Sequence, residues 1–386
     1  MAGRRKEEFS ENKGRVKGFD FLKQMIKETK NEYASTVSEG TVYDTTSYID
    51  LGNFLLNKQT GGDMFKGIQG NTCCCFAGEE GVGKTYLLLG IIKSFLDSNP
   101  EGVVALFESE GAIKKSTFDE RNIDGSRVNI FPIGTVEDFK FQCNKVIDSY
   151  GEIPKDERFP FLIALDSLGM LSDNKEMGDA VAGEDKSDMG GHAKRIKAIF
   201  RVIRQKLGKY NIPMFLTNHL FTDPSGYVPT HKIAGGSGLK YAVNSILILT
   251  KKKIKQGDEA FEDGGIAVTC TANKMRETRP FTQIPFTINF TKGVTRYSGL
   301  FDFCLEHGLI TKSGMQYMFD PSIDEQQKLF KKKTAMQNPE SVFTDEIMQK
   351  LNKATDCIFL FGESASEIMQ NEDFDEDIED SETSEE

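Results

Sequence analysis

The most specific chemical signature in this chain of 386 residues is a glycine-rich segment that ends in a lysine and a threonine. Residues 78–85 read Gly-Glu-Glu-Gly-Val-Gly-Lys-Thr, which is a complete GxxxxGK[ST] motif. Such glycines let successive backbone N–H groups face phosphate oxygens at the N-terminus of the next helix. Lys84 would neutralise the β and γ phosphates of a nucleotide, and Thr85 would bind Mg²⁺. An apolar run before the motif and a helical stretch after it favour a nucleotide site over an ordinary glycine-rich turn.

An acid that would complete the metal site follows a second apolar run. Residues 161–165 read Phe-Leu-Ile-Ala-Leu and are followed by Asp166. A phosphate-binding loop has its second metal ligand at the end of a buried strand of the same sheet. Thr85 and Asp166 are therefore the expected Mg²⁺ ligands, and a turn cap is the alternative role for Asp166. The residues expected around the nucleotide are Gly78, Glu79, Glu80, Gly81, Val82, Gly83, Lys84, Thr85, Tyr86 and Asp166.

Two further polar side chains follow the ends of apolar runs. Glu110 would orient and deprotonate the water that attacks the γ-phosphate if its strand neighbours that of Asp166. A surface charge at a strand exit is the alternative. His219 would hydrogen-bond the γ-phosphate, although a lone histidine is more often a structural hydrogen-bonding group. Together with Lys84, these two residues are the expected catalytic set.

Strands and helices that would position these residues alternate along the middle of the chain. Because short apolar runs are separated by amphipathic helical segments, we expect an α/β fold with a mostly parallel central sheet covered on both faces. The runs between 245 and 290 follow one another with turn-rich connectors, which predicts antiparallel strands that extend this sheet. The expected strands are residues 73–77, 103–107, 128–131, 161–165, 213–217, 246–250, 267–272 and 286–290.

The two ends of the chain differ from this core. Residues 1–45 are polar, with one helical stretch near 19–29, and are expected to form an arm for oligomerisation. The core is assigned to 46–300, and 301–370 form a small C-terminal region that is weakly periodic after about residue 320. The tail, 371–386, contains ten Asp or Glu and no Lys or Arg, so it is expected to be disordered. Without these ten charges the net charge of −11 becomes −1, and the acidic total does not exclude nucleic acid.

Composition also excludes several classes of protein. No apolar run reaches the roughly 18 residues of a membrane span, and the basic N-terminus lacks the apolar segment of a secretory signal. We therefore expect a cytoplasmic protein without a membrane partner. Seven cysteines, three of them consecutive, lack the spacing of a disulfide framework or zinc site. The histidines other than His219 lack metal-ligand spacing.

Two glycine-rich polar segments, 172–191 and 221–238, each follow a strand that ends at the proposed site. The helix after the first segment has an apolar stripe and many cations, which suit DNA phosphates or simply a solvated face. The second segment combines an aromatic ring and cations with flexible glycines, as single-stranded nucleic acid requires. The residues expected to bind DNA are Arg195, Tyr227, His231, Lys232, Gly235 and Gly236.

The order of these motifs resembles that of the RecA/Rad51-type strand-exchange recombinases, and in particular their bacteriophage UvsX branch. The resemblance covers about residues 45–320 and implies a RecA-like P-loop ATPase core. It also implies a helical filament on single-stranded DNA, with ATP bound between adjacent protomers. The motifs that carry it are residues 78–85, 107–110, 165–167, 218–219, 235–241 and 297–300.

Carried over by position, the resemblance implies that Glu110 is the catalytic carboxylate and that His219 senses the γ-phosphate. The two glycine-rich segments match the DNA-binding loops of such proteins. Bacterial RecA has glutamine where this chain, like the phage branch, has His219. Thr117 stands where an adenine-stacking tyrosine is expected, which leaves adenine recognition open.

The resemblance also implies that the active site is shared between subunits. Lys274 and Arg276 match the region from which such proteins send cations across the interface to the γ-phosphate of a neighbour. Their spacing to Pro280 is longer than in bacterial RecA. The segment near residues 41–48, or the helix before it, would dock on the next protomer.

We therefore expect an ATP- and Mg²⁺-dependent protein that forms filaments on single-stranded DNA, pairs it with homologous double-stranded DNA and hydrolyses ATP. A single-strand-binding protein and a loading mediator are expected partners, in the host cytoplasm if the protein is phage-encoded. A hexameric replicative helicase with the same core is one alternative. A recombination mediator that uses ATP only as a switch is another, although the presence of both Glu110 and Asp166 argues against it.

Overall fold

The computed structural model describes residues 18, 20–30, 34–41, 44–45, 47–183, 191–223, 230–251, 265–290 and 293–362. The chain divides into two units, residues 1–46 and 47–386. In the first unit, residues 20–29 are helical, as expected, and η1 spans Val37–Glu39. Three of the apolar side chains on this helix, Phe21, Leu22 and Met25, are exposed. The predicted acidic tail lies outside the described residues.

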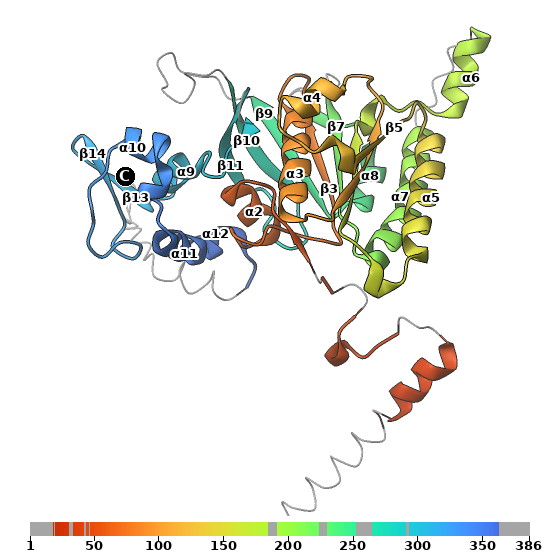
Figure 1. The fold of residues 1–386 in the computed structure, drawn as a ribbon, viewed down its shortest axis with the longest axis horizontal. Helices are drawn as coiled ribbons and strands as arrows, with labels where there is room; N and C mark the ends of the chain where they lie inside the picture. Colours follow the sequence, from red (N-terminus) through yellow and green to blue (C-terminus); the bar gives the residue numbers. More distant parts are fainter. Residues whose placement is uncertain are drawn as a thin grey trace, which may run out of the picture. The chain divides into compact units, whose positions relative to one another are not determined.

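One large sheet organises the second unit (Figure 1). Its strands run in the order β12-β11-β10-β9-β3-β7-β6-β4-β5, and β8 pairs with β7. The strands from β5 to β9 along this order are parallel, whereas β10, β11 and β12 are antiparallel to their neighbours. The bounds are β3 Cys73–Gly78, β4 Val103–Glu108, β5 Val128–Pro132, β6 Phe161–Asp166, β7 Met214–Asp223, β8 Thr230–Ile233, β9 Ser245–Lys251, β10 Gly265–Lys274, β11 Gln283–Asn289 and β12 Gly293–Val294. The α/β fold, with its antiparallel extension, is as the sequence predicts.

Helices cover both faces of this sheet, as expected for parallel strands. Alternate residues of β3 point to opposite faces of the sheet and so divide the core into two layers. Cys74 and Phe76 pack toward α2 and α3, while Cys73 and Cys75 pack toward α5, α7 and α8. The consecutive cysteines are therefore buried core residues. The helices are α2 Phe54–Gly61, α3 Lys84–Ser98, α4 Lys115–Asp119, α5 Val136–Glu152, α6 Asn174–Ala182, α7 Gly191–Tyr210 and α8 Gly236–Ala242, with short turns η2 Gly125–Arg127, η3 Lys155–Glu157 and η4 Leu168–Met170.

The C-terminal region packs beside the β11 end of the sheet (Figure 1). A hairpin follows α9, and three helices lie in the part that the sequence marks as weakly periodic. A fully buried lysine, Lys58 of α2, anchors the last two of these helices, because its Nζ donates to the backbone O of Asn352 at 2.7 Å and to the carboxylate of Asp356. The elements are α9 Leu300–Glu306, β13 Ile310–Ser313, β14 Gln316–Phe319, α10 Lys332–Gln337, η6 Pro339–Ser341, α11 Asp345–Ala354 and α12 Asp356–Phe359.

A second small sheet lies at the start of the unit, where β1 Tyr48–Ile49 pairs with β2 Ile68–Gln69. Asn53 caps α2 by accepting the N–H of Leu56. Its amide also donates to the backbone of Thr295 and Ser298, which ties the start of α2 to the turn between β12 and α9. Within the described ranges no helix combines the length and apolar character that a membrane crossing requires.

Candidate nucleotide and DNA site

The carboxyl ends of β3, β4, β6 and β7 form one edge of the sheet, here called the phosphate edge. Gly78, the last residue of β3, pairs with His219 of β7. Glu108, the last residue of β4, pairs with Asp166 of β6. The strands of Glu108 and Asp166 are therefore neighbours, as the role expected of Glu110 requires. The topology brings the glycine-rich loop, both acids and the imidazole to one edge, where ligands of open α/β sheets bind.

Glycines of the loop occupy conformations that a side chain would disturb. Gly81 and Gly83 have φ of +67° and +93°, in the left-handed region that favours glycine. A Cβ on Gly83 would lie 2.4 Å from Cδ1 of Ile288 in β11. The loop therefore turns tightly onto the N-terminus of α3, where free N–H groups and the helix dipole attract an anion. These residues fit a triphosphate.

Lys84 opens α3 and folds back over the loop. Its Nζ donates to the backbone O of Gly78 at 3.0 Å and of Glu79 at 2.9 Å, and the side chain is buried. Burial lowers the pKa of Lys84, while the carboxylates of Glu110 and Asp166 oppose this change. A phosphate oxygen in the loop would replace these carbonyls and favour the charged form.

Thr85 and Asp166 form the expected pair of metal ligands. The hydroxyl of Thr85 donates to Oδ2 of Asp166 at 2.7 Å, and the hydroxyl of Thr217 donates to the other carboxylate oxygen. Burial raises the pKa of Asp166, against the two hydroxyl hydrogen bonds, and repulsion from Glu110 adds to the rise. Hydroxyl and carboxylate oxygens are the donors that Mg²⁺ prefers, and a divalent cation would reverse the rise in pKa. The donor set fits Mg²⁺.

Glu110, Ser167 and His219 meet beside this pair. The hydroxyl of Ser167 donates to Oε1 of Glu110 at 2.7 Å, and Nε2 of His219 lies 3.2 Å from the same oxygen. The ring nitrogen also lies 3.1 Å from the Ser167 hydroxyl. Such a held carboxylate can accept a proton from water, and the imidazole adjoins it in a position to bond a phosphate oxygen. Ser167 was not among the predicted site residues.

Glu108 is a second residue that the sequence analysis missed, although it lies in the same short motif. Its carboxylate accepts the backbone N–H groups of Glu110, Gly111 and Ala112 at 2.9–3.1 Å. It is buried, so these bonds fix the chain that carries Glu110. Its position directly after the predicted strand 103–107 was a usable signal.

Lys251 is a further missed cation, at the end of β9. Because β9 is parallel to β3, its carboxyl end also reaches the phosphate edge, where Leu249 pairs with Gly78. The Nζ of Lys251 lies 3.3 Å from the position that a Cβ on Gly81 would take. Repulsion from Lys251 also contributes to the lowered pKa of Lys84. The phosphate loop therefore has two lysines beside it.

A buried amide connects His219 to the second glycine-rich segment. Asn218 donates from Nδ2 to the backbone O of Ala234 at 2.8 Å and accepts the N–H of His219 at 2.9 Å. The N–H of Ala234 in turn donates to the backbone O of His219. A Cβ on Gly169 would lie 2.8 Å from the His219 ring, so the ring is closely packed. The backbone of His219 is thereby hydrogen-bonded to the chain at Ala234, both directly and through Asn218.

Lys274 and Arg276 lie at the other end of the sheet, here called the opposite edge. Lys274 pairs with Ile246 of β9, which pairs with Cys75, three residues before the loop begins. The Nζ of Lys274 donates to the backbone O of Val243 at 2.6 Å. These cations therefore do not join the phosphate loop of their own chain.

The opposite edge concentrates positive charge. Burial, Arg276 and Arg204 together lower the pKa of Lys274 to about 8. Burial and Arg276 likewise lower the pKa of Arg204 on α7. Nearby anions would be favoured here, because they would relieve repulsion among the three cations.

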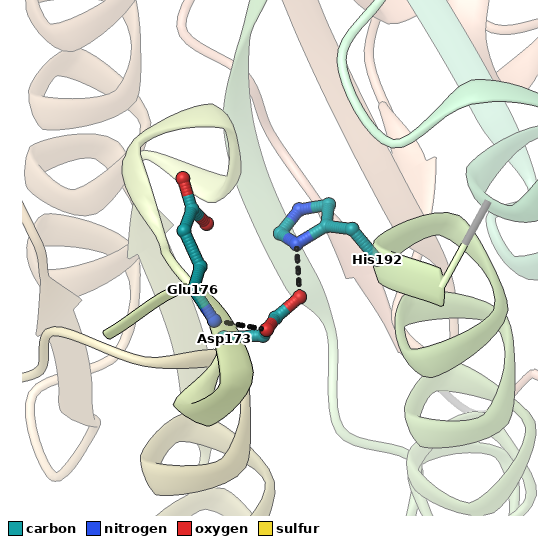
Figure 2. A group of neighbouring side chains, drawn as sticks. All are labelled: Asp173, Glu176 and His192. Atoms are coloured by element: carbon teal, nitrogen blue, oxygen red, sulfur yellow. Dashed lines mark hydrogen bonds and ion pairs between the residues drawn. The ribbon is translucent and has the colours of Figure 1, made fainter. Parts of the chain in front are cut away.

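The first glycine-rich segment is partly helical, because α6 occupies much of it; residues 184–190 lie outside the described ranges. Asp173 caps α6 through the N–H of Lys175 and Glu176, and it binds the guanidinium of Arg195. Burial opposes ionisation of Asp173, but the Glu176 N–H and Arg195 outweigh it and lower the pKa. Figure 2 shows Asp173 between Glu176 and His192, whose ligand atoms lie within 4.8 Å of one another.

Because Arg195 already neutralises Asp173, this cluster joins α6 to α7 rather than offering a free set of metal ligands. Arg195 is thus engaged within the chain, and its predicted DNA contact stays a prediction. Other cations on the same helix, Lys194, Lys197 and Arg201, are exposed. The positive charge of α7 therefore does not depend on Arg195 alone.

The second segment also contains regular structure that the sequence analysis did not expect. β7 runs on to Asp223 and pairs with β8, whose register sets His231 and Lys232 opposite Thr222 and Phe221. Predicted Tyr227 lies outside the described residues. Gly235 and Gly236 have φ of +80° and +59° and open α8, and a Cβ on Gly235 would lie 2.9 Å from Ile196 of α7.

Comparison with known proteins agrees with this arrangement. No protein-family model matches the chain. The chain is 24% identical over 307 residues to the recombination and repair protein of Enterobacteria phage T4, covering 80% of this chain and 76% of that protein. It is 24% identical over 303 residues to RecA of Malacoplasma penetrans (78% and 86% covered) and 27% identical over 256 residues to RecA of Fusobacterium nucleatum (64% and 62% covered). These similarities confirm the predicted resemblance of this chain to the RecA-type recombinases, including their phage branch.

Proposed function

We propose that this protein is an ATP-dependent DNA strand-exchange protein. It polymerises as a helical homo-oligomer on single-stranded DNA and pairs this strand with homologous double-stranded DNA. The observation that carries the proposal is the polarity of one sheet, with nucleotide groups at the phosphate edge and the cations Lys274 and Arg276 at the opposite edge. Subunits stacked head to tail would place one edge against the other.

Each nucleotide residue has a separate part in this proposal. ATP, bound together with Mg²⁺, contains the phosphoanhydride bond to the γ-phosphate that is cleaved. The loop amides and Lys84 hold the phosphates, and Lys251 adds a second positive charge from the same subunit. Thr85 and Asp166 hold the metal ion. Lys274 and Arg276 reach the γ-phosphate of the adjacent subunit and so couple ATP binding to polymerisation.

Hydrolysis depends on the group around Glu110. The carboxylate takes the proton of the attacking water while the oxygen of that water bonds to the γ-phosphorus and the bond to the leaving ADP breaks. Ser167 and His219 keep the carboxylate in place, and Glu108 fixes the backbone that carries it. Loss of the γ-phosphate weakens the subunit boundary and releases DNA.

Signal transfer to DNA follows the hydrogen bonds through Asn218. A γ-phosphate at His219 orders the chain at Ala234, and with it Gly235 and Gly236 at the start of α8. His231 and Lys232 precede this turn. Lys194 and Arg201 on α7 add phosphate contacts, while the bases remain free to pair with a homologous strand. The same residues grip any sequence, because they read phosphates and stacked bases.

Accessory partners follow from this role. Single-stranded DNA in a cell is covered by a single-strand-binding protein, which this protein must displace. A mediator would load this protein onto the DNA. The proposed place of action is the cytoplasm, that of the host if the protein is phage-encoded.

Electron microscopy of the protein with single-stranded DNA and a non-hydrolysable ATP analogue tests the proposal. Long right-handed helices are the expected result, and the Lys84→Ala variant should form none. Closed rings that unwind duplexes would indicate a helicase instead. Filaments without DNA-stimulated ATP turnover would indicate an ATP-switched mediator.

A further inference from the structure

An aromatic ring and a guanidinium group are stacked beside the phosphate loop. The ring belongs to Tyr86, which is among the residues expected around the nucleotide, but neither group has a part in the hydrolysis described above. Tyr86 follows Thr85 directly in the first turn of α3, and the guanidinium carbon of Arg121 lies 4.2 Å from the centre of its ring. Arg121 follows α4, which lies close to α3 (Figure 1). Both side chains are only partly buried, so part of the stack faces solvent.

The stack is held in place from both sides. Tyr86 packs against the apolar core through α3. The Nη1 atom of Arg121 donates to the backbone O of Thr117 at 2.9 Å, so the guanidinium is fixed above the ring. The resemblance places a base-stacking tyrosine at position 117, where this chain has a short hydroxyl side chain. The planar surface at this place therefore comes from Arg121 and Tyr86.

A stacked arginine and tyrosine suit a purine for physical reasons. Guanidinium and aromatic planes both stack on base faces, and a cation over a ring strengthens the pair. Lys84 and Thr85 face the terminal phosphates and the metal ion, so the nucleoside must leave the loop elsewhere. Tyr86 is the next residue of the helix and offers the first aromatic surface along it.

We propose that Tyr86 and Arg121 form the platform on which the adenine of ATP stacks. This inference rests on the proposed nucleotide-dependent function and adds to it the residues that recognise the base. It separates two halves of the ligand: the loop binds the triphosphate, and the platform binds the nucleoside. Substitution of the platform should therefore weaken ATP without weakening a ligand that has no base.

Isothermal titration calorimetry with Mg-ATP and with Mg-tripolyphosphate tests this separation. Arg121→Ala and Tyr86→Ala should each lower the affinity for Mg-ATP about tenfold, which is the effect of losing one stacked base. Both should leave the affinity for Mg-tripolyphosphate unchanged. Tyr86→Phe keeps the ring and should bind ATP as the wild type does. Lys115→Ala, which removes an exposed cation from α4, controls for net charge.

Equal losses for ATP and tripolyphosphate would overturn the inference, because the pair would then support the loop or supply only charge. Unchanged ATP affinity in both alanine variants would overturn it as well. Assays of the wild type distinguish a failure of the adenine platform from a failure of the proposed function. If the variants show that ATP binds through this pair, but the wild type neither polymerises on single-stranded DNA nor hydrolyses ATP, the proposed function fails and the base site stands. If the wild type binds neither ATP nor tripolyphosphate, both proposals fail.

Discussion

The two edges of the central sheet use charged groups in different ways. At the phosphate edge, the acids are held by hydroxyl, imidazole and backbone N–H groups: Thr85 and Thr217 bind Asp166, and Ser167 binds Glu110. At the opposite edge, Lys274 donates to backbone carbonyls but has Arg276 and Arg204 as charged neighbours. The first edge is a preorganised site, and the second is a cluster of like charges.

Each edge supplies what the other lacks. The phosphate edge has a place for a triphosphate, whose charge exceeds what Lys84 and Lys251 neutralise. The opposite edge has cations whose mutual repulsion an anion would relieve. A heterologous contact between the edges of successive subunits would satisfy both, and it would build a filament if the rotation between subunits does not close a ring.

Two substitutions at the phosphate edge should separate binding from turnover. Lys84→Ala removes the cation of the loop and should lower the affinity for ATP by about 100-fold or more. ATP-dependent DNA binding should fall with it. Glu110→Gln should retain ATP and hold DNA longer, while turnover falls by roughly 10²–10⁴-fold. Calorimetry, DNA-binding titrations and ATPase assays measure these effects. Equal loss of DNA affinity in both variants would show that Glu110 has been assigned wrongly.

Removing the cation at the opposite edge should spare nucleotide binding and impair assembly. Lys274→Ala should bind ATP as the wild type does, yet lose at least about tenfold in ATP-dependent polymerisation on single-stranded DNA. Lys274→Arg retains a cation and serves as the matched control. Sedimentation of filaments and calorimetry of free protein measure the two properties. A loss of ATP affinity in isolated subunits would place Lys274 in its own site and contradict the comparison.

Assembly should also depend on pH through Lys274, whose pKa is lowered to about 8 by burial, Arg276 and Arg204. Because this pKa is lower in the folded subunit than in the unfolded chain, the protonated Lys274 destabilises the isolated subunit below about pH 8. This destabilisation disappears as the pH rises from about 8 toward the ordinary pKa of lysine. A phosphate binds the protonated form, so contact between subunits should weaken as the pH rises above about 8. Lys274→Arg should remove this dependence from filament sedimentation measured between pH 7 and 9. The same pH profile in both proteins would exclude Lys274 as its source.

The smallest effects should come from the cations that we propose to bind DNA. Neutralising Lys232 should weaken binding to all sequences alike and lower the salt dependence by about one unit of slope. Arg195→Gln should lower the salt dependence of DNA binding by less than one unit of slope, because Arg195 is already bound to Asp173. Arg201→Gln, on an exposed turn of the same helix, is the matched comparison. Salt titrations of DNA binding would contradict this order if Arg195→Gln reduced the slope more than Arg201→Gln.

Much of the core follows from the sequence because its signals are local. Each expected strand of the core is present, since buried parallel strands are short apolar runs that contrast with amphipathic helices. The phosphate loop and Asp166 are recognisable because glycine, lysine and an acid must occupy fixed places relative to strand ends. The resemblance then orders the remaining motifs.

Other features depend on contacts that no local pattern contains. Lys251 was missed because the run that ends there was interpreted as part of an antiparallel extension, whereas β9 also lies parallel to β3. The β7–β8 pairing and α6 were hidden in segments rich in glycine and polar residues. The sequence after residue 320 was interpreted as weakly periodic, which is wrong for α11: this helix is strongly amphipathic, buries Met348 and Leu351, and is capped by Thr344. Tertiary packing decides these elements.

A subunit-mixing experiment tests the complementarity of the two edges most directly. Glu110→Gln and Lys274→Ala should each be nearly inactive as DNA-dependent ATPases when assayed alone. In an equal mixture, a Lys274→Ala subunit retains its own Glu110 and receives Lys274 from a Glu110→Gln neighbour, so we predict about a quarter of wild-type turnover if the subunits mix at random. Turnover no greater than the sum of the two separate variants would contradict a site shared between subunits.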